Sequence, residues 1–208
     1  MISNFIKKNF FTLLLVPYAV GTIGILLPVT RAFFLGLTPI MLIFSFVLVV
    51  VEEGKWTRFN VFALLFIFVG GFFVEFIGVN YGYFFGDYQY GTTLEPKWRD
   101  VPLIIATNWV MLCIASRSLV NLVTQHKALS AFLAAAVVTA YDYLLEPVAL
   151  KFSWWWWDGG CIPMLNYLCW FGFSFVFQLF FRKVPATTGR SFWMIFVHAI
   201  FYWILLLM

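Results

Sequence analysis

Three acidic residues lie within long apolar stretches of this 208-residue chain. Glu75 falls in the apolar run 59–80, and Asp142 and Glu146 fall together in the run 128–150. A charged side chain at membrane depth costs a few kcal/mol or more, so such acids are candidate functional residues. The i, i+4 spacing places Asp142 and Glu146 on one face of a helix. Two ionised acids this close repel each other, which favours a proton on one of them and predicts a proton donor.

The composition indicates an integral membrane protein. Hydrophobic residues make up 63% of the chain and charged residues 11%, whereas soluble domains carry about 25% charged residues. Long apolar runs recur along the whole chain, so we expect an all-α fold with a single polytopic membrane domain over residues 1–208. The net charge of +4 does not indicate nucleic-acid binding, because the Lys and Arg residues are scattered between the apolar runs.

Seven apolar stretches predict about seven transmembrane helices, each about long enough to cross a hydrocarbon core ~30 Å thick. These stretches cover residues 10–27, 33–51, 59–80, 102–123, 128–150, 163–181 and 191–208. Basic residues gather on the N-terminal side of the predicted membrane, which predicts a cytoplasmic N-terminus and an extracytoplasmic C-terminus in the plasma (inner) membrane. The residues on that side are Lys7, Lys8, Lys55, Arg58, Lys127, Arg182, Lys183 and Arg190, against Arg31, Lys97, Arg99 and Lys151 on the other.

This topology predicts that polar residues from four spans lie at one depth. The acids come late in outward-going helices, and two Asn and two Trp residues come early in inward-going helices. We therefore expect a pocket embedded in the outer leaflet. The residues that share this depth are Glu75, Asn108, Trp109, Asp142, Glu146, Asn166 and Trp170.

The segment 81–100, between the third and fourth spans, is too polar and too rich in glycine to cross the membrane. Tyr81, Tyr88 and Tyr90 are amphipathic and suit the headgroup layer. We expect a partly re-entrant or interfacial lid over the pocket, with an ordinary interfacial loop as the alternative. Asp87 is a candidate ligand contact that solvation at the membrane surface would also explain.

Four consecutive tryptophans, 154–157, follow the span that carries Asp142 and Glu146. A membrane-interface belt explains most of them. The functional alternative is that one or two rings, such as Trp155 and Trp157, face the pocket and bind an apolar chain or stabilise a cation.

Several other chemistries lack the sequence signals they need. No His/Cys cluster indicates a metal, no glycine-rich loop indicates phosphate binding, and the last span has no lysine for a Schiff base. Each acid could instead be structural, and Asn108 and Asn166 could simply link helices by hydrogen bonds. A cofactor-independent proton transfer to an apolar substrate, or proton-coupled transport, remains.

Two sequence blocks, which together span residues 75–170, resemble the carotenoid biosynthesis family that includes bisanhydrobacterioruberin hydratase and the acyclic carotenoid hydratases. The first block contains Glu75, Gly78, Gly82, Gly86, Tyr88, Tyr90, Gly91, Pro102, Asn108 and Trp109, and the second contains Asp142, Glu146, Pro147, Trp155, Trp157, Pro163, Asn166 and Trp170. The resemblance implies hydration of the terminal isoprene double bond of a carotenoid in a lipid membrane, without a cofactor or a metal.

The residue roles follow from the chemistry of that reaction. We expect the pair Asp142 and Glu146 to donate the proton and Glu75 to position water or share the proton, because burial and a like charge both favour a protonated acid. A carotenoid end-group cyclase, a carotenoid or lipid carrier and a proton-coupled transporter remain alternatives. The expected substrate-binding residues are Tyr81, Asp87, Tyr88, Tyr90, Asn108, Trp109, Trp155, Trp157, Asn166 and Trp170.

Overall fold

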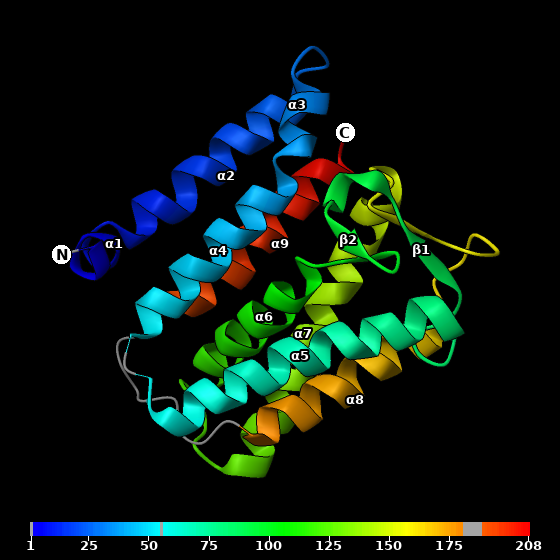
Figure 1. Ribbon diagram of the computed structural model, residues 1–208. Helices are drawn as coiled ribbons and strands as arrows, with labels where there is room; N and C mark the ends of the chain where they lie inside the picture. The colour runs from blue at the N-terminus through cyan, green and yellow to red at the C-terminus, as the bar shows by residue number, and fades with distance from the viewer. Residues whose placement is uncertain (1, 55, 181–188) are drawn as a thin grey trace.

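The computed structural model describes residues 2–54, 56–180 and 189–208 and consists mainly of α-helices (Figure 1). Lys55, Arg182 and Lys183, which the predicted orientation uses, lie outside the described residues, as does Phe181 at the end of the sixth predicted span. The helices are α1 (Ile2–Lys8), α2 (Phe10–Leu26), α3 (Arg31–Gly36), α4 (Thr38–Glu53), α5 (Arg58–Tyr81), α6 (Ile105–Val120), α7 (Lys127–Lys151), α8 (Met164–Phe180) and α9 (Trp193–Leu206). Shorter elements are the strands β1 (Tyr88–Tyr90), β2 (Lys97–Trp98), β3 (Val101–Pro102) and β4 (Trp155–Trp157), with 3-10 helices at Thr92–Leu94 and Arg190–Phe192.

The apolar helices support the prediction of a membrane protein but only part of the predicted topology. In the part of the chain that the structure describes, α5 and α7 are each long and apolar enough to cross a membrane. Helices α1 and α2, bent by 71° at their junction, would add a third span if the pair counts as one. Helices α6 and α8 and the segment Arg190–Leu206 are apolar but shorter. The seven expected spans therefore stay a prediction.

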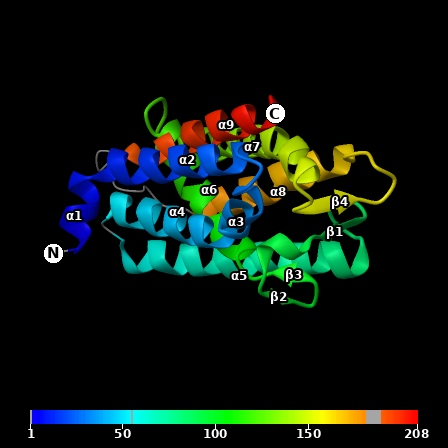
Figure 2. The same ribbon diagram turned by 90° about the horizontal axis from the view of Figure 1, so that it is seen from above.

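Helix α6 lies at the centre of the helix bundle. It is buried along nearly its whole length, as expected for a helix that is apolar on most sides. Helices α4, α5 and α7 pack around it, α8 packs on α7, and α9 packs on both α7 and α2. Seen from above, β1 and β4 lie together at one end of the bundle and α1 lies at the other (Figure 2).

The predicted lid segment forms a short sheet with the tryptophan run. Strands β1 and β4 are antiparallel, with Tyr88 opposite Trp157 and Tyr90 opposite Trp155. Successive side chains of a strand point to opposite faces, so these four aromatic residues are buried together while Gln89 and Trp156, between them, are exposed. We call Tyr88, Tyr90, Trp155 and Trp157 the aromatic ladder.

Candidate active site

An apolar cavity of about 260 Å³ lies between the β1–β4 pair and helices α2, α4, α5, α6, α7, α8 and α9. All three acids, Glu75, Asp142 and Glu146, line it although they come from two different helices. Each of these acids is 1–2% exposed. Since a buried charge or polar group costs free energy unless it is hydrogen-bonded, the partners of each carboxyl group decide what it can do.

Glu75 accepts hydrogen bonds from three donors. The hydroxyls of Tyr88 and Tyr90 donate to Oε2 at 2.6 and 2.8 Å, and Nε1 of Trp109 donates to Oε1 at 3.2 Å. Burial, followed by the charge of Glu75, raises the pKa of both tyrosines well above the usual range, so the hydroxyls keep their protons. Three donors and no acceptor suit an ionised carboxylate at Glu75.

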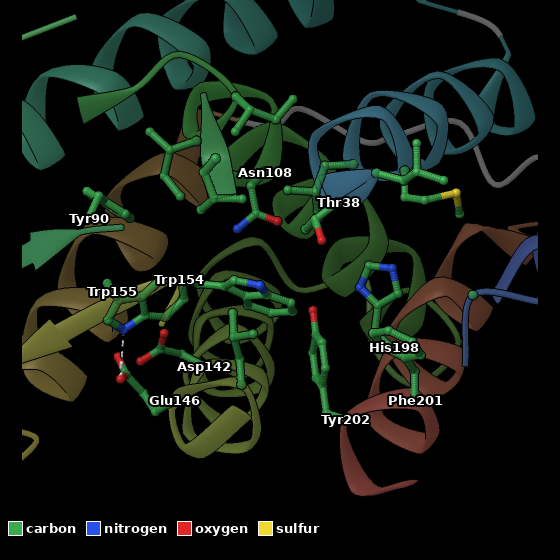
Figure 3. A pocket seen from close by; sticks show the side chains of 18 of the residues that line it. Thr38, Tyr90, Asn108, Asp142, Glu146, Trp154, Trp155, His198, Phe201 and Tyr202 are labelled. Atoms are coloured by element: carbon green, nitrogen blue, oxygen red, sulfur yellow. Dashed lines mark hydrogen bonds between the residues drawn. The ribbon is translucent and has the colours of Figure 1, made fainter. Parts of the chain in front are cut away.

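Glu146 has the same kind of environment, supplied by the opposite strand. The indole N–H groups of Trp155 and Trp157 donate to Oε2 at 3.0 and 2.9 Å, and Nδ2 of Asn166 donates to Oε1 at 3.1 Å. Because each strand turns every second side chain inward, β1 presents two hydroxyls to Glu75 and β4 presents two indole N–H groups to Glu146. Figure 3 shows Trp155 of β4 bonded to Glu146. The aromatic ladder thus holds two acids that are far apart in sequence.

Asp142 differs from the other two acids. Its Oδ2 accepts one hydrogen bond, from Nδ2 of Asn166 at 2.8 Å. Its Oδ1 is buried and has no hydrogen-bond partner among the described residues. Asn166 therefore links Asp142 to Glu146, while one oxygen of Asp142 stays unpaired beside the cavity. A carboxyl group with a single donor and a nearby carboxylate is the one of the three that best accommodates a proton.

Aromatic rings form much of the remaining wall. Trp170 lines the cavity and stacks on Trp109, with ring centroids 4.0 Å apart and planes 14° apart. Trp109 is fully buried behind Trp170 and reaches Glu75 from there. Its position depends on Gly71 of α5, because a Cβ atom there would lie 2.6–2.8 Å from three atoms of the Trp109 side chain.

We expect Gly71→Ala to lower stability by roughly 1–3 kcal/mol, since the added methyl group displaces Trp109 from its stack and from Glu75. The unfolding temperature of the purified protein in detergent measures this effect. Gly172→Ala is a matched control, because Gly172 also lies inside a helix and has no atom within 4 Å of an added Cβ. Equal unfolding temperatures for the two variants would contradict the proposed support of Trp109 by Gly71.

The structure brings most of the predicted site residues together. Tyr88, Tyr90, Asn108, Trp155, Trp157, Asn166 and Trp170 line the cavity with the three acids, and Trp109 lies directly behind them. Tyr81 and Asp87 do not line the cavity; both are exposed, and Tyr81 packs against Phe76 and Tyr83.

Sequence reasoning missed several polar and aromatic residues of the cavity wall, four of which have side chains that can hydrogen-bond to a ligand through N–H or O–H groups. Trp154, whose Nε1 has no partner among the described residues, lies beside Asp142, and His198 and Tyr202 lie farther along the wall (Figure 3). Tyr18 also lines the cavity. The i, i+4 spacing of His198 and Tyr202 in an apolar helix is a signal that they share a face. Across residues 2–54, 56–180 and 189–208, no group of three or more His, Cys, Asp or Glu is placed to hold a metal ion.

Comparison with known proteins identifies the family of the chain. The family model described as "Carotenoid biosynthesis protein" matches residues 32–208. Neither the curated proteins nor the solved structures gave a match. The matched region contains every acid and every residue of the aromatic ladder, and it confirms the resemblance seen in the sequence. Since the match covers most of its length, the chain belongs to the carotenoid biosynthesis protein family.

Proposed function

We propose that this protein adds water across the terminal isoprene double bond of an acyclic carotenoid end group. Membership of the family supports a role in carotenoid biosynthesis, and the apolar helices support a location in a membrane. The observation that carries the finer proposal is the environment of Asp142. It alone among the three acids keeps an unpaired oxygen beside an apolar cavity, where a proton donor is required and few other groups could supply one.

The reaction begins with proton transfer from Asp142 to the less substituted carbon of the double bond. A tertiary carbocation forms on the other carbon, and Asp142 becomes a carboxylate. Water then adds to the cation, and the resulting oxonium ion loses a proton to a carboxylate. The sum is the addition of one water molecule, with the proton returned to the acids. General acid catalysis of this kind contributes about 10²- to 10⁴-fold.

Stabilisation of the cation falls to the charges and rings of the cavity wall. Glu75 and Glu146 place negative charge near the reacting carbon, while three donors occupy most of the lone-pair directions of each carboxylate. The faces of Trp155 and Trp170 attract a cation through their ring quadrupoles. Groups that are fixed before the reaction stabilise developing charge without reorganising.

Water needs polar partners in this otherwise apolar cavity. The amide of Asn108 extends from α6 into the cavity (Figure 3). Glu75, on the neighbouring helix α5, also lines the cavity. We assign these two residues to positioning the water that captures the cation.

Pigment analysis in water labelled with oxygen-18 tests the reaction class. Membranes that contain the protein are incubated with the acyclic carotenoid lycopene. The products are then separated, and their molecular masses are measured by mass spectrometry. Hydration adds one labelled water per modified end. An end-group cyclase would give a product of unchanged mass, and a carrier or transporter would return the carotenoid chemically unaltered, so either result overturns the proposed function.

A further inference from the structure

A second polar cluster reaches the cavity wall through Tyr18, His198 and Tyr202, and the proposed hydration does not use it. Five side chains of α2, α4, α7 and α9 form one continuous series of hydrogen bonds. The series runs from Ser45 to Tyr18 (2.7 Å), from Tyr18 to Nε2 of His198, from Nδ1 of His198 to Tyr141 (2.6 Å), and from Tyr141 to Tyr202 (2.7 Å). We call it the Tyr–His network.

The Tyr–His network consists of uncharged groups. Its members are all 8% exposed or less. Both ring nitrogens of His198 bond to tyrosine hydroxyls, and a buried imidazolium without an anionic partner would be costly. The network therefore suits a neutral polar group of a ligand, such as a hydroxyl or a carbonyl, and not an ion.

The Tyr–His network contains one more O–H or N–H proton than it has hydrogen bonds. With His198 neutral, the four hydroxyls and the single imidazole N–H supply five protons, and the series contains four hydrogen bonds. One O–H group is therefore left without an acceptor inside the network. An unpaired donor in an apolar interior is unfavourable, so a ligand that accepts a hydrogen bond from this O–H group binds more tightly.

The tautomer of His198 decides where that spare proton lies. If Nε2 carries the proton, it donates to Tyr18, and Tyr18 donates to Ser45. The spare proton then lies on the buried hydroxyl of Ser45, which has no other partner among the described residues. If Nδ1 carries the proton, it donates to Tyr141, and Tyr141 donates to Tyr202. The spare proton then lies on the hydroxyl of Tyr202, which lines the cavity. Figure 3 shows the Tyr202 hydroxyl directed into the cavity, with the indole of Trp154 between it and Asp142. An oxygen atom in the cavity thus favours the second arrangement.

We propose that Tyr202 donates a hydrogen bond to a neutral oxygen, a hydroxyl or a carbonyl, that the carotenoid carries near the end that enters the cavity. This inference rests on the proposed carotenoid substrate and names its class more closely. The reacting double bond lies at Asp142, the oxygen lies at Tyr202, and the ring of Trp154 contacts the chain between them. The protein then selects an oxygenated end group over a plain hydrocarbon.

Binding measurements with two carotenoids test this selection independently of turnover. The protein contains ten tryptophans, so quenching of their fluorescence in lipid nanodiscs reports binding of lycopene, a hydrocarbon, and of a hydroxylycopene whose hydroxyl group lies several carbon atoms from an intact terminal double bond. The wild type is expected to bind this hydroxylycopene about fivefold more tightly than lycopene, the effect of one neutral hydrogen bond. Tyr202→Phe should bind both equally, whereas Tyr143→Phe, at an exposed position outside the cavity, should keep the preference.

Several results would overturn the inference, and they separate it from the proposed function. Equal affinity of the wild type for both carotenoids contradicts it without the need for any variant. A preference that survives in Tyr202→Phe contradicts it as well. If Tyr202→Phe slows the hydration of both carotenoids equally and leaves their binding unchanged, Tyr202 holds water and not the substrate oxygen. If neither carotenoid binds, the carotenoid substrate itself is wrong.

Discussion

Asp142→Asn is expected to abolish carotenoid hydration while the protein still folds. The amide keeps the size of the side chain and can still bond to Asn166 after rotation, but it cannot donate a proton of carboxylic acidity to an alkene. Hydration should fall by about 10²- to 10⁴-fold, the usual contribution of a general acid. Liquid chromatography of pigments from a carotenoid-producing host that expresses the variant measures the loss of product per amount of protein.

Two further variants test whether the loss of hydration is specific to Asp142. Asp87→Asn makes the same chemical change at an exposed position outside the cavity, so hydration should stay at the wild-type level. Glu146→Gln should lower hydration less than Asp142→Asn does, because it removes a stabilising charge but leaves the donor in place. Wild-type hydration by Asp142→Asn would refute Asp142 as the donor, and a larger loss in Glu146→Gln would move that role to Glu146.

The acids of the site could be predicted because the free-energy cost of an acid in an apolar run is evident from the neighbouring sequence alone. Glu75, Asp142 and Glu146 stand out in apolar runs whatever their neighbours are, and the i, i+4 spacing puts Asp142 beside Glu146 in any helix. The cavity contains all three. Which acid carries the proton could not be read from the sequence, since it depends on donors from β1, β4, α6 and α8 that only the fold brings near.

The aromatic ladder and the Tyr–His network could not be predicted for a different reason. Tyr88 and Tyr90 look like residues of a headgroup layer until β1 pairs with β4, and that pairing joins segments that a whole helical hairpin separates in the chain. His198 is a lone polar residue in an apolar helix, and its partners Tyr18 and Tyr141 lie on two other helices. The partners of such a polar residue can be identified only when the packing of the helices is known.

Gly91→Ala is expected to disrupt the aromatic ladder and with it both carboxylate sites. The N–H group of Gly91 donates to the carbonyl of Trp154 at 2.8 Å, which brings the two strands into close contact. An added Cβ would lie 2.0 Å from the carbonyl oxygen of Ser153. Because that oxygen belongs to the backbone and not to a flexible side chain, the strands must move apart, and the four ladder donors move with them.

The predicted loss is large because one methyl group acts on Glu75 and Glu146 together. A displacement that costs a few kcal/mol corresponds to roughly a tenfold or greater fall in hydration. Gly36→Ala is the matched control, since an alanine there meets no atom within 4 Å. Near-ultraviolet circular dichroism, which reports fixed aromatic packing, should change in Gly91→Ala and not in Gly36→Ala, while the helical far-ultraviolet signal stays the same. If Gly91→Ala alters neither the aromatic signal nor hydration, the β1–β4 pair does not hold the acids, and the ordering of the site must come from the helices alone.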